Sequence, residues 1–329
     1  MYRPGQEKEI NNYKIVPVIA GTFFIVDYLM KKSIGIIGVP SSAGAHWPGQ
    51  EKTPFYLRNA GFIKQLKKGG FDVAYFGDLP LVRFHPDKVN REKQNWKMVL
   101  DVATGVASKV ASAVEKGTIP LIIGGDCTIS LGVLAGFITR EEDIGLLYFD
   151  GHIDLNTPIT SVSGILDSMG VAHMIGAEGT VKELSHIGKR FPLLAKEKIV
   201  LFGYNPKENN KPELELLEKL KIKNYSLEDI RLKGIEAARE ALNHLEQNSK
   251  KFLVHLDVDV IDFTDLPVAD VPQYSQSLMF KDVIDCLYVF ASSNKFGGLV
   301  ITEFNPDHLD EEGKHAEIFI EGIIKALQG

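Results

Sequence analysis

Residues 144–154 read IGLLYFDGHID, a stretch in which an almost wholly apolar run ends at Asp150-Gly-His152-Ile-Asp154. An unbroken apolar run of this kind is typical of a parallel strand that is covered on both faces of its sheet. In an extended backbone residues i, i+2 and i+4 share a face, so Asp150, His152 and Asp154 can point at one site. Because the polar residues begin where the run stops, we expect them at the carboxyl edge of a parallel sheet, where open α/β folds bind ligands.

Three other stretches repeat this arrangement of an apolar run followed by acidic residues. They are Phe252 to Leu256 followed by Asp257-Val-Asp259, Pro120 to Ile123 followed by Gly124-Gly125-Asp126-Cys127, and Leu299 to Ile301 followed by Glu303-Phe-Asn305-Pro306 after one residue. Carboxylates gathered at one edge would raise one another's pKa unless a cation lay among them. One or two divalent metal ions supply that charge, and carboxylates with an imidazole are a common ligand set for manganese, iron or zinc.

Apolar runs alternate with segments of helical periodicity along most of the chain. The predicted strands are Ile34 to Val39, Val73 to Phe76, Pro120 to Ile123, Ile144 to Phe149, Ile199 to Phe202, Phe252 to Leu256 and Leu299 to Ile301. The predicted helices include Asn95 to Glu115, Thr128 to Ile138, Val181 to Ala195, Leu227 to Glu246, Phe280 to Ser292 and His315 to Leu327. Strict alternation of strand and helix predicts an α/β fold with a parallel sheet and crossover helices on both faces.

Together with Ser163-Gly-Ile-Leu-Asp167-Ser168, these stretches resemble the ureohydrolase family, which contains arginase, agmatinase and formiminoglutamase. The family pattern is Gly-Gly-Asp-His, Asp-Ala-His-x-Asp, Ser-Gly-x-x-His-Gly, Asp-x-Asp and Glu-x-Asn-Pro, and its order and spacing agree with residues 34–329. The resemblance implies a three-layer α-β-α fold with a mostly parallel sheet of about eight strands. The arginase-like domain would span residues 33–329, and residues 1–32 would be an N-terminal extension outside the match.

The resemblance also implies two divalent ions, most commonly Mn²⁺. One ion would be held by Cys127, Asp150, Asp154 and Asp257, and the other by His152, Asp150, Asp257 and Asp259, with Asp150 and Asp257 bridging them. Cys127 departs from the family, because a histidine usually stands there. A thiolate is a softer ligand that suits Zn²⁺ or Fe²⁺ better than Mn²⁺. The alternative is a neutral thiol beside a weakened or empty metal site.

A second departure is Asp167, which stands where the family carries a histidine that shuttles protons to the leaving amine. We expect Asp167 to grip a cationic part of the substrate; it could instead be an acid or base, or cap the segment Ser168 to Ile175. Asn156 and Ser163 match positions that hold the substrate's α-carboxylate in arginase. Glu303 is expected to pair with the guanidinium; the alternative is a capping or salt-bridged loop acid. The Arg-Asp-x-Asp segment of arginase is not matched.

The leading functional hypothesis is a metal-dependent hydrolase of a linear guanidine or amidine C–N bond. A water bridging the two ions would become hydroxide and attack the trigonal carbon, while the metals and Asp259 stabilise the tetrahedral intermediate and the departing amine. Cys127 and Asp167 favour a second hypothesis, a catalytically inactive or regulatory metal-binding protein. The retained acids and His152 oppose it, because such groups are expensive to bury without a cation. A deacetylase-like enzyme shares the fold, but Gly-Gly-Asp and Glu-x-Asn-Pro favour a ureohydrolase.

Composition agrees with a single α/β enzyme domain. The chain has 329 residues of which 44% are hydrophobic, and its net charge of −6 without a basic stripe argues against a nucleic-acid partner. Two cysteines indicate a reducing compartment, and we predict a cytoplasmic protein in which Cys286 is a core residue. The apolar stretch from Ile15 to Met30 contains Asp27 and is shorter than the about 20 residues that span a bilayer, so no membrane association is predicted. The resemblance implies a homo-oligomer, either a trimer or a hexamer.

Overall fold

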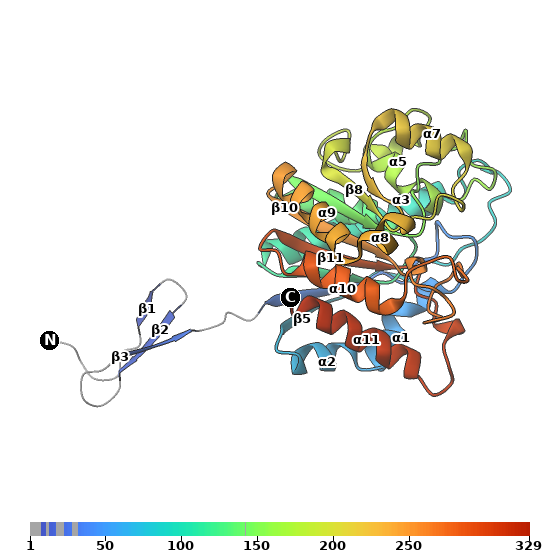
Figure 1. The fold of residues 1–329 in the computed structure, drawn as a ribbon. Helices are drawn as coiled ribbons and strands as arrows, with labels where there is room; N and C mark the ends of the chain where they lie inside the picture. Colours follow the sequence, from blue (N-terminus) through green and yellow to red (C-terminus); the bar gives the residue numbers. More distant parts are fainter. Residues whose placement is uncertain (1–7, 11–12, 18–22, 28–31, 142) are drawn as a thin grey trace.

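The computed structural model describes residues 8–10, 13–17, 23–27, 32–141 and 143–329, and an eight-stranded parallel sheet forms the centre of the protein (Figure 1). The strands lie in the order β5-β4-β6-β11-β10-β7-β8-β9. Their bounds are β4 (Ser33–Gly38), β5 (Asp72–Asp78), β6 (Ile119–Ile123), β7 (Ile144–Phe149), β8 (Ile199–Phe202), β9 (Lys223–Tyr225), β10 (Lys251–Asp257) and β11 (Phe296–Thr302). The predicted α/β class and parallel sheet are confirmed.

Helices cover both faces of the sheet and make the three layers that the alternating pattern predicts. One hydrophobic core lies under α1 (Thr53–Asn59), α2 (Phe62–Lys68), α8 (Leu227–Lys233), α9 (Ile235–Asn248), α10 (Phe280–Ala291) and α11 (Lys314–Leu327). The other lies under α3 (Trp96–Glu115), α4 (Ile129–Ile138), α5 (Gly170–Met174), α6 (Lys182–Ser185) and α7 (Lys211–Leu220). Successive residues of the central strands alternate between the two cores, as side chains of a strand must.

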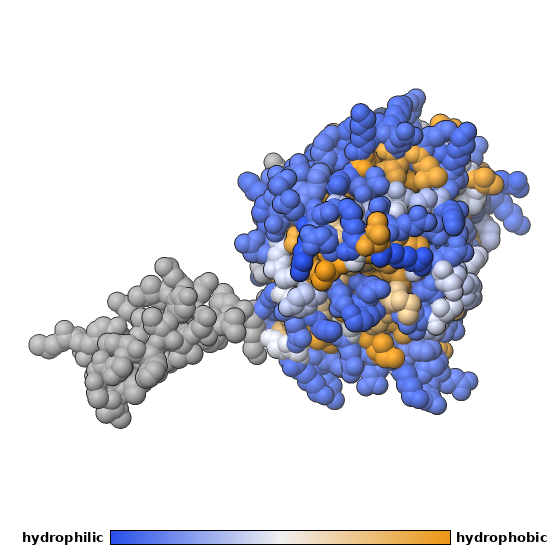
Figure 2. Space-filling view, in the orientation of Figure 1, coloured by the Kyte–Doolittle hydropathy of each residue, from blue (hydrophilic) through white to orange (hydrophobic). Residues whose placement is uncertain are grey.

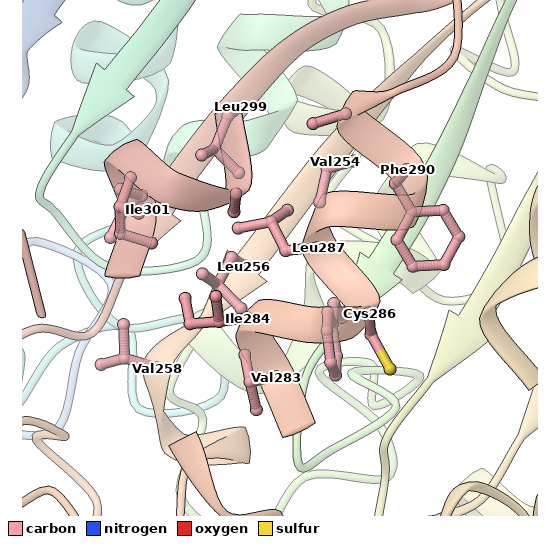
Figure 3. Packing of buried hydrophobic residues seen from close by; sticks show 14 of the residues in the cluster. Val254, Leu256, Val258, Val283, Ile284, Cys286, Leu287, Phe290, Leu299 and Ile301 are labelled. Atoms are coloured by element: carbon pink, nitrogen blue, oxygen red, sulfur yellow. The ribbon is translucent and has the colours of Figure 1, made fainter. Parts of the chain in front are cut away.

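Figure 3 shows the first core where α10 packs on β10 and β11. Val283, Ile284 and Leu287 of α10 face the apolar side chains of the two strands, and the contributing strand residues are Val254, Leu256, Leu299 and Ile301. Cys286 belongs to this cluster and is 3% exposed, which confirms its prediction as a core residue. Close packing at this face fixes the ends of β10 and β11, from which site residues continue.

Some of the predicted helices differ from the structure in extent. The prediction of a helix from Val181 to Ala195 was wrong, because only Lys182–Ser185 is helical and turns follow. Pro192 lacks an amide hydrogen and disfavours a continuous helix there. The helix predicted from Leu227 to Glu246 divides into α8 and α9 at Gly234, whose φ of 58° lies in the left-handed region.

The N-terminal extension predicted over residues 1–32 lies only partly within the described residues. Its described strands are β1 (Lys8–Ile10), β2 (Tyr13–Pro17) and β3 (Phe23–Asp27), which pair antiparallel in a separate three-stranded sheet. Residues 1–7, 11–12, 18–22 and 28–31 lie outside the described residues. The main sheet begins with β4 at Ser33, which is where the predicted domain begins.

The face shown in Figure 2 is covered mainly by hydrophilic residues, with hydrophobic residues in small groups among them. Scattered apolar groups of this kind are normal on a folded domain whose larger apolar side chains fill its cores. Among the residues that the structure describes, none of the helices is both long and apolar enough to cross a membrane.

Candidate active site and metal centre

The predicted site residues follow neighbouring strands at one edge of the sheet. β6, β11, β10 and β7 lie side by side, and their register places Ile123 opposite Ile301 and Leu256 opposite Phe149. The loops that leave these strands therefore meet. Within the described ranges, three groups of side chains have donor atoms within 4.8 Å of one another, close enough to hold a cation. They are Cys127, Asp150, His255 and Asp257; Asp150, His152 and Asp259; and Cys127, Asp167 and Glu303.

Two glycines after β6 bring Cys127 to this edge. Gly124 has a φ of 87° and Gly125 a φ of 91°, a conformation that other residues rarely adopt. A Cβ atom on Gly124 would lie 2.6 Å from Cδ of Pro54, and one on Gly125 would lie 2.9 Å from Cγ2 of Ile129. The two glycines thus allow a tight turn between α1 and α4, and the chain reaches the site without a steric clash.

The first group, which we call the inner group (Cys127, Asp150, His255 and Asp257), is buried. The Cys127 Sγ lies 2.9 Å from Asp257 Oδ2, 3.4 Å from His255 Nε2 and 4.0 Å from Asp150 Oδ2. The His255 Nε2 lies 3.5 Å from Asp150 Oδ2. One sulfur, one nitrogen and two carboxylate oxygens therefore lie within 4.8 Å of one another, and this donor set suits a zinc-class cation.

His255 is a member of this group that the sequence analysis missed. It lies inside the run Phe252 to Leu256, which was interpreted as buried strand, rather than after it. A signal was present, because His255, Asp257 and Asp259 alternate and so share one face of extended backbone. Burial lowers the pKa of His255 to about 3, so its imidazole is neutral and has a free electron pair to offer.

The second group, which we call the outer group (Asp150, His152 and Asp259), adjoins the inner group through Asp150. The His152 Nδ1 lies 2.8 Å from Asp259 Oδ2 and 3.7 Å from Asp150 Oδ1. Burial lowers the pKa of His152, but the carboxylates of Asp259, Asp150 and Asp154 together outweigh that effect and hold this pKa well above its ordinary value. Backbone amides orient the acids: Gly151 donates to Asp259 over 3.0 Å, and His152 donates to Asp150 over 2.6 Å.

Asp154, a predicted ligand beside Cys127, is not a member of these groups. Its Oδ2 accepts a hydrogen bond from the hydroxyl of Tyr148, and its φ of 47° lies in the left-handed region. Burial raises the pKa of its carboxyl, and the neighbouring Asp150 raises it further. The structure thus brings together all the predicted ligands except Asp154, which lies beside them on Tyr148.

Asp167 and Glu303 form a carboxyl pair beside Cys127. The backbone amide of Cys127 donates to Asp167 Oδ1 over 2.6 Å and to Glu303 Oε1 over 3.2 Å. One oxygen of each carboxyl lies within 4.8 Å of the other, and burial raises the pKa of both groups well above the ordinary value. Asp167 makes no helix-capping hydrogen bond, since neither the 3₁₀ turn Asp167–Met169 nor α5 has a side-chain cap. Its carboxylate is available to the site instead.

Glu303 is held in place by residues that sequence reasoning did not select. Its φ of 60° is unusual for a residue with a side chain, and its amide donates to Gly125 O over 3.1 Å. The buried Gln50 donates through Nε2 to Glu303 Oε2 over 2.7 Å and to Asp270 Oδ2 over 2.8 Å. Asn305, from the predicted motif, donates to Asp270 Oδ1 over 2.6 Å. These bonds orient the Glu303 carboxyl into the site.

Of the two predicted substrate-binding residues, one is buried and one is exposed. Asn156 is buried, and its Oδ1 accepts from Asn210 Nδ2 over 2.7 Å and from Thr160 Oγ1 over 3.1 Å. Ser163 is exposed, and its Oγ lies 3.3 Å from Ser161 Oγ. Both lie on the loop that follows β7, the strand that also leads to the inner and outer groups.

The electrostatics of the site call for a cation. Burial, together with nearby carboxylates, raises the pKa of Asp150, Asp257 and Glu303 well above the ordinary value. Burial also raises the pKa of the Cys127 thiol, and Asp257 adds to that effect. A divalent cation placed between these donors would reverse both effects, because it stabilises carboxylates and thiolate. The donor atoms present therefore fit metal ions.

The comparisons with known proteins identify the family. A model described as "Arginase family" matches residues 32–327. The chain belongs to the arginase family. Arginase of Bacillus caldovelox is 29% identical over 293 residues, which cover 88% of this chain and 96% of that protein. Arginase-1 of Homo sapiens is 30% identical over 279 residues, covering 84% of this chain and 85% of that protein.

Solved structures confirm the arginase-like fold. The native arginase structure from Bacillus caldovelox has a TM-score of 0.83 at 27% identity, covering 91% of this chain and 99% of that chain. A formiminoglutamase of Trypanosoma cruzi with Mn²⁺ has a TM-score of 0.68 at 16% identity, covering 90% of this chain and 93% of that chain, and shows likeness of fold alone. The predicted ureohydrolase family and three-layer architecture are therefore correct.

Proposed function

We propose that this arginase-family protein hydrolyses a C–N bond of a linear guanidine or amidine with two divalent ions at the inner and outer groups. Its family consists of hydrolases of such bonds, as the sequence predicted. The observation that carries the proposal is the convergence of Cys127, Asp150, His152, Asp257 and Asp259 on adjoining groups that share Asp150. The similarity to arginases also favours a hydrolase over the inactive or regulatory metal-binding alternative.

The outer group provides oxygen and imidazole donors that suit Mn²⁺, whereas the sulfur of Cys127 makes Zn²⁺ or Fe²⁺ the better match for the inner group. When bound, the two ions would lower the pKa of a water molecule and polarise the scissile carbon. Asp259 belongs to the outer group, and its carboxylate lies 2.8 Å from His152 Nδ1. It would help to stabilise the tetrahedral intermediate and the departing amine.

The carboxyl pair of Asp167 and Glu303 would bind the cationic end of the substrate. Burial raises the pKa of both carboxyls, and the neighbouring Asp167 raises that of Glu303 further. A guanidinium or amidinium group would stabilise both carboxylates and donate a charged hydrogen bond to each, a strong form of recognition. The position of Asp167 beside Glu303 thus favours a role in binding the substrate, and Glu303 matches the family position that binds the guanidinium.

Asn156 and Ser163 would receive the far end of an amino-acid-like substrate. Ser163 is exposed on the loop, where its Oγ accepts from the Ile165 amide over 3.3 Å and lies 3.3 Å from Ser161 Oγ, and its hydroxyl would donate to a substrate carboxylate. Asn156 is anchored by Asn210 and Thr160 through its oxygen, and its amide nitrogen would donate to the same carboxylate. Loss of activity on α-carboxylated substrates alone in a Ser163→Ala variant would support this assignment.

We further propose a cytoplasmic homo-oligomer, a trimer or hexamer, whose enzyme domain spans residues 33–329. Light scattering on purified protein determines the subunit number. Comparison of the full chain with a variant lacking residues 1–32 tests the domain boundary, since a self-sufficient domain should keep its melting temperature and its activity.

The function is tested by screening metal-loaded protein against arginine, agmatine, guanidinobutyrate, formiminoglutamate and N-hydroxylated guanidines. Release of urea, hydroxyurea, formamide or ammonia is measured with Mn²⁺ alone and with Mn²⁺ plus Zn²⁺. We expect one substrate to be turned over only with metal, and Glu303→Gln to lower that activity without loss of bound metal. Full metal content without turnover of any of these substrates would contradict a guanidine or amidine hydrolase.

A further inference from the structure

We infer that His255 is a metal ligand, and that it completes with Cys127, Asp150 and Asp257 a four-donor site for a zinc-class cation. The inference rests on the proposed function only in assuming that this edge of the sheet binds metal. It concerns the residue that replaces the imidazole missing at position 127, and it assigns a role to a histidine that the sequence analysis passed over.

Two of the four donor separations given for the inner group match those around one tetrahedral ion, and the other two lie on either side of the expected value. With Zn–S near 2.3 Å and Zn–N or Zn–O near 2.0 Å, tetrahedral donors lie about 3.5 Å apart for S to N or O and about 3.3 Å apart for N to O. The observed separations are 3.4 Å from Cys127 Sγ to His255 Nε2 and 3.5 Å from His255 Nε2 to Asp150 Oδ2. The sulfur-to-carboxylate distances of 2.9 and 4.0 Å bracket the expected value. Small side-chain adjustments would seat the ion.

The surroundings of His255 hold its Nε2 toward this point. Its Nδ1 lies 2.7 Å from the Ser130 hydroxyl on α4, the kind of hydrogen bond that orients metal-binding histidines and fixes their tautomer. Its ring stacks on Tyr148, with ring centroids 4.1 Å apart and an angle of 1° between the planes. The ring is fully buried, so the imidazole has little freedom to turn away.

The same contacts explain why Asp154 lies outside the inner group. Tyr148 stacks on His255 with its ring and donates to Asp154 with its hydroxyl, so it separates the two side chains. His255 then occupies the coordination position that the family resemblance gives to Asp154, while Asp154 supports Tyr148. A histidine that only hydrogen-bonds Cys127, Ser130 and Thr302 would be a core residue without a ligand role, and the experiment below separates these two cases.

Cobalt serves as the probe, because a thiolate bound to Co²⁺ gives a near-ultraviolet charge-transfer band that reports on the Cys127 site directly. Metal-free, reduced full-length protein receives Co²⁺ in steps, and the band is followed to saturation. For His255→Ala we expect the apparent Co²⁺ affinity of the site that gives the band to fall at least about tenfold. Loss of a residue that only hydrogen-bonds a metal ligand already lowers metal affinity by about 10-fold or more, and loss of the ligand itself should cost at least as much. Unchanged affinity and band shape would overturn the inference.

His173 offers a matched control, since it is also a buried histidine but has both ring nitrogens engaged by backbone. Its Nδ1 lies 2.7 Å from Met169 O, and its Nε2 accepts from the Val181 amide over 3.1 Å. His173→Gln should leave the cobalt band and its affinity unchanged. A loss of the band in both variants with equal loss of helical circular dichroism would report unfolding, and the decision then passes to a second variant.

That second variant is His255→Cys, which keeps a metal-binding side chain at the same position. A ligand role predicts a charge-transfer intensity per cobalt about twice that of the wild type, because two thiolates replace one. Wild-type intensity in a folded His255→Cys protein would overturn the inference. Neither measurement uses turnover, so a protein that shows the cobalt behaviour but hydrolyses no guanidine would contradict the proposed function and leave the role of His255 intact.

Discussion

The inner and outer groups share Asp150 but differ in chemistry and in access to solvent. The inner group offers sulfur and a fully buried imidazole, whereas the outer group offers carboxylates and His152, whose side chain is 26% exposed. Softer donors in a buried place favour a tightly held zinc-class ion, and oxygen donors near solvent favour an exchangeable Mn²⁺. Under the proposed function, the two adjoining groups would therefore bind different metals.

The largest effect is expected for Asp150→Asn, because this residue belongs to both groups. Loss of a carboxylate shared by two ions should release both. Mutation of a residue that only hydrogen-bonds a metal ligand lowers activity by roughly 10- to 100-fold, so the rate of hydrolysis should fall by more than that. Elemental analysis after gel filtration measures the metal. Asp262→Asn is the control, because Asp262 is a buried acid that accepts from Thr264 and Ser277 and lies outside the metal groups. Two ions retained in Asp150→Asn would contradict a shared site.

The comparison becomes sharper with Asp259→Asn, which alters the outer group alone. The amide oxygen can still accept from Gly151, so the local backbone should persist, while the charge that holds His152 is lost. We expect loss of the outer ion, retention of the inner one, and a fall in turnover of about 100-fold. Metal content near one ion per chain, with the cobalt charge-transfer band intact, would bear this out. Loss of the band would show that the two groups are not independent.

Much of this site could be predicted because the candidate ligands come directly after apolar runs, where parallel strands end. Asp150, His152, Asp257 and Asp259 follow that rule, and the structure brings them together. His255 broke it, because it stands within β10 among buried apolar neighbours and reads as strand interior. Gln50 and Tyr148 have no local pattern at all, since their roles depend on contacts with residues distant in the sequence.

The fold was predictable for the same reason, and its prediction failed where the hydrophobic pattern is weaker. The long buried strands of the sheet centre are unbroken apolar runs, but the edge strand β9 is only Lys223–Tyr225 and mixes charged and polar residues. The hydrophobic pattern of β9 alone does not reveal a strand, because β9 is defined by its pairing with β8. The helices α1, α2 and α7 were also not predicted; α7 begins with an Asn210 capping box that offered a usable signal.

Asp167→Asn addresses the carboxyl pair beside the inner group. The side-chain amide oxygen of this variant could still accept from the Cys127 backbone amide, so folding should be kept while one charged contact to a cationic substrate is lost. A charged hydrogen bond contributes about 1.5 to 3 kcal/mol to binding. Because Glu303 still binds the substrate, we expect a loss at the lower end of this range, about a tenfold decrease in kcat/KM that appears mostly as a higher KM. Steady-state kinetics measures it. A decrease confined to kcat, together with a shift of the acid side of the pH–rate profile, would instead show that Asp167 donates a proton.

Cys127→His tests the softness of the inner group. The variant would place two imidazoles among the carboxylates, so in competition with equimolar metals the ratio of bound Zn²⁺ to bound Mn²⁺ should fall. The larger ring enters a buried position and is expected to cost about 1 to 3 kcal/mol of unfolding free energy, which thermal melting checks. Elemental analysis of the competed protein gives the ratio. An unchanged ratio would show that the sulfur does not set metal preference.

The smallest effect concerns pH and the metal-free protein. Burial, with nearby acids, raises the pKa of Asp150, Asp154 and Asp257 in the folded chain above the unfolded value of 3.8. The pKa of His152 lies above 6.5 because the surrounding carboxylates together outweigh burial. The folded protein therefore holds protons that the unfolded chain has released, and its free energy of unfolding falls as pH rises. Between about pH 5 and pH 8, a melting temperature measured with chelator should drop by several degrees, since 1 kcal/mol corresponds to roughly 2 to 4 °C for domains of this order of size.

Bound cations displace the same protons, so saturating Zn²⁺ and Mn²⁺ should flatten or reverse the trend, and the stabilisation by metal should grow with pH. A chelated protein that becomes more stable as pH rises would contradict the clustering of these acids in the folded state.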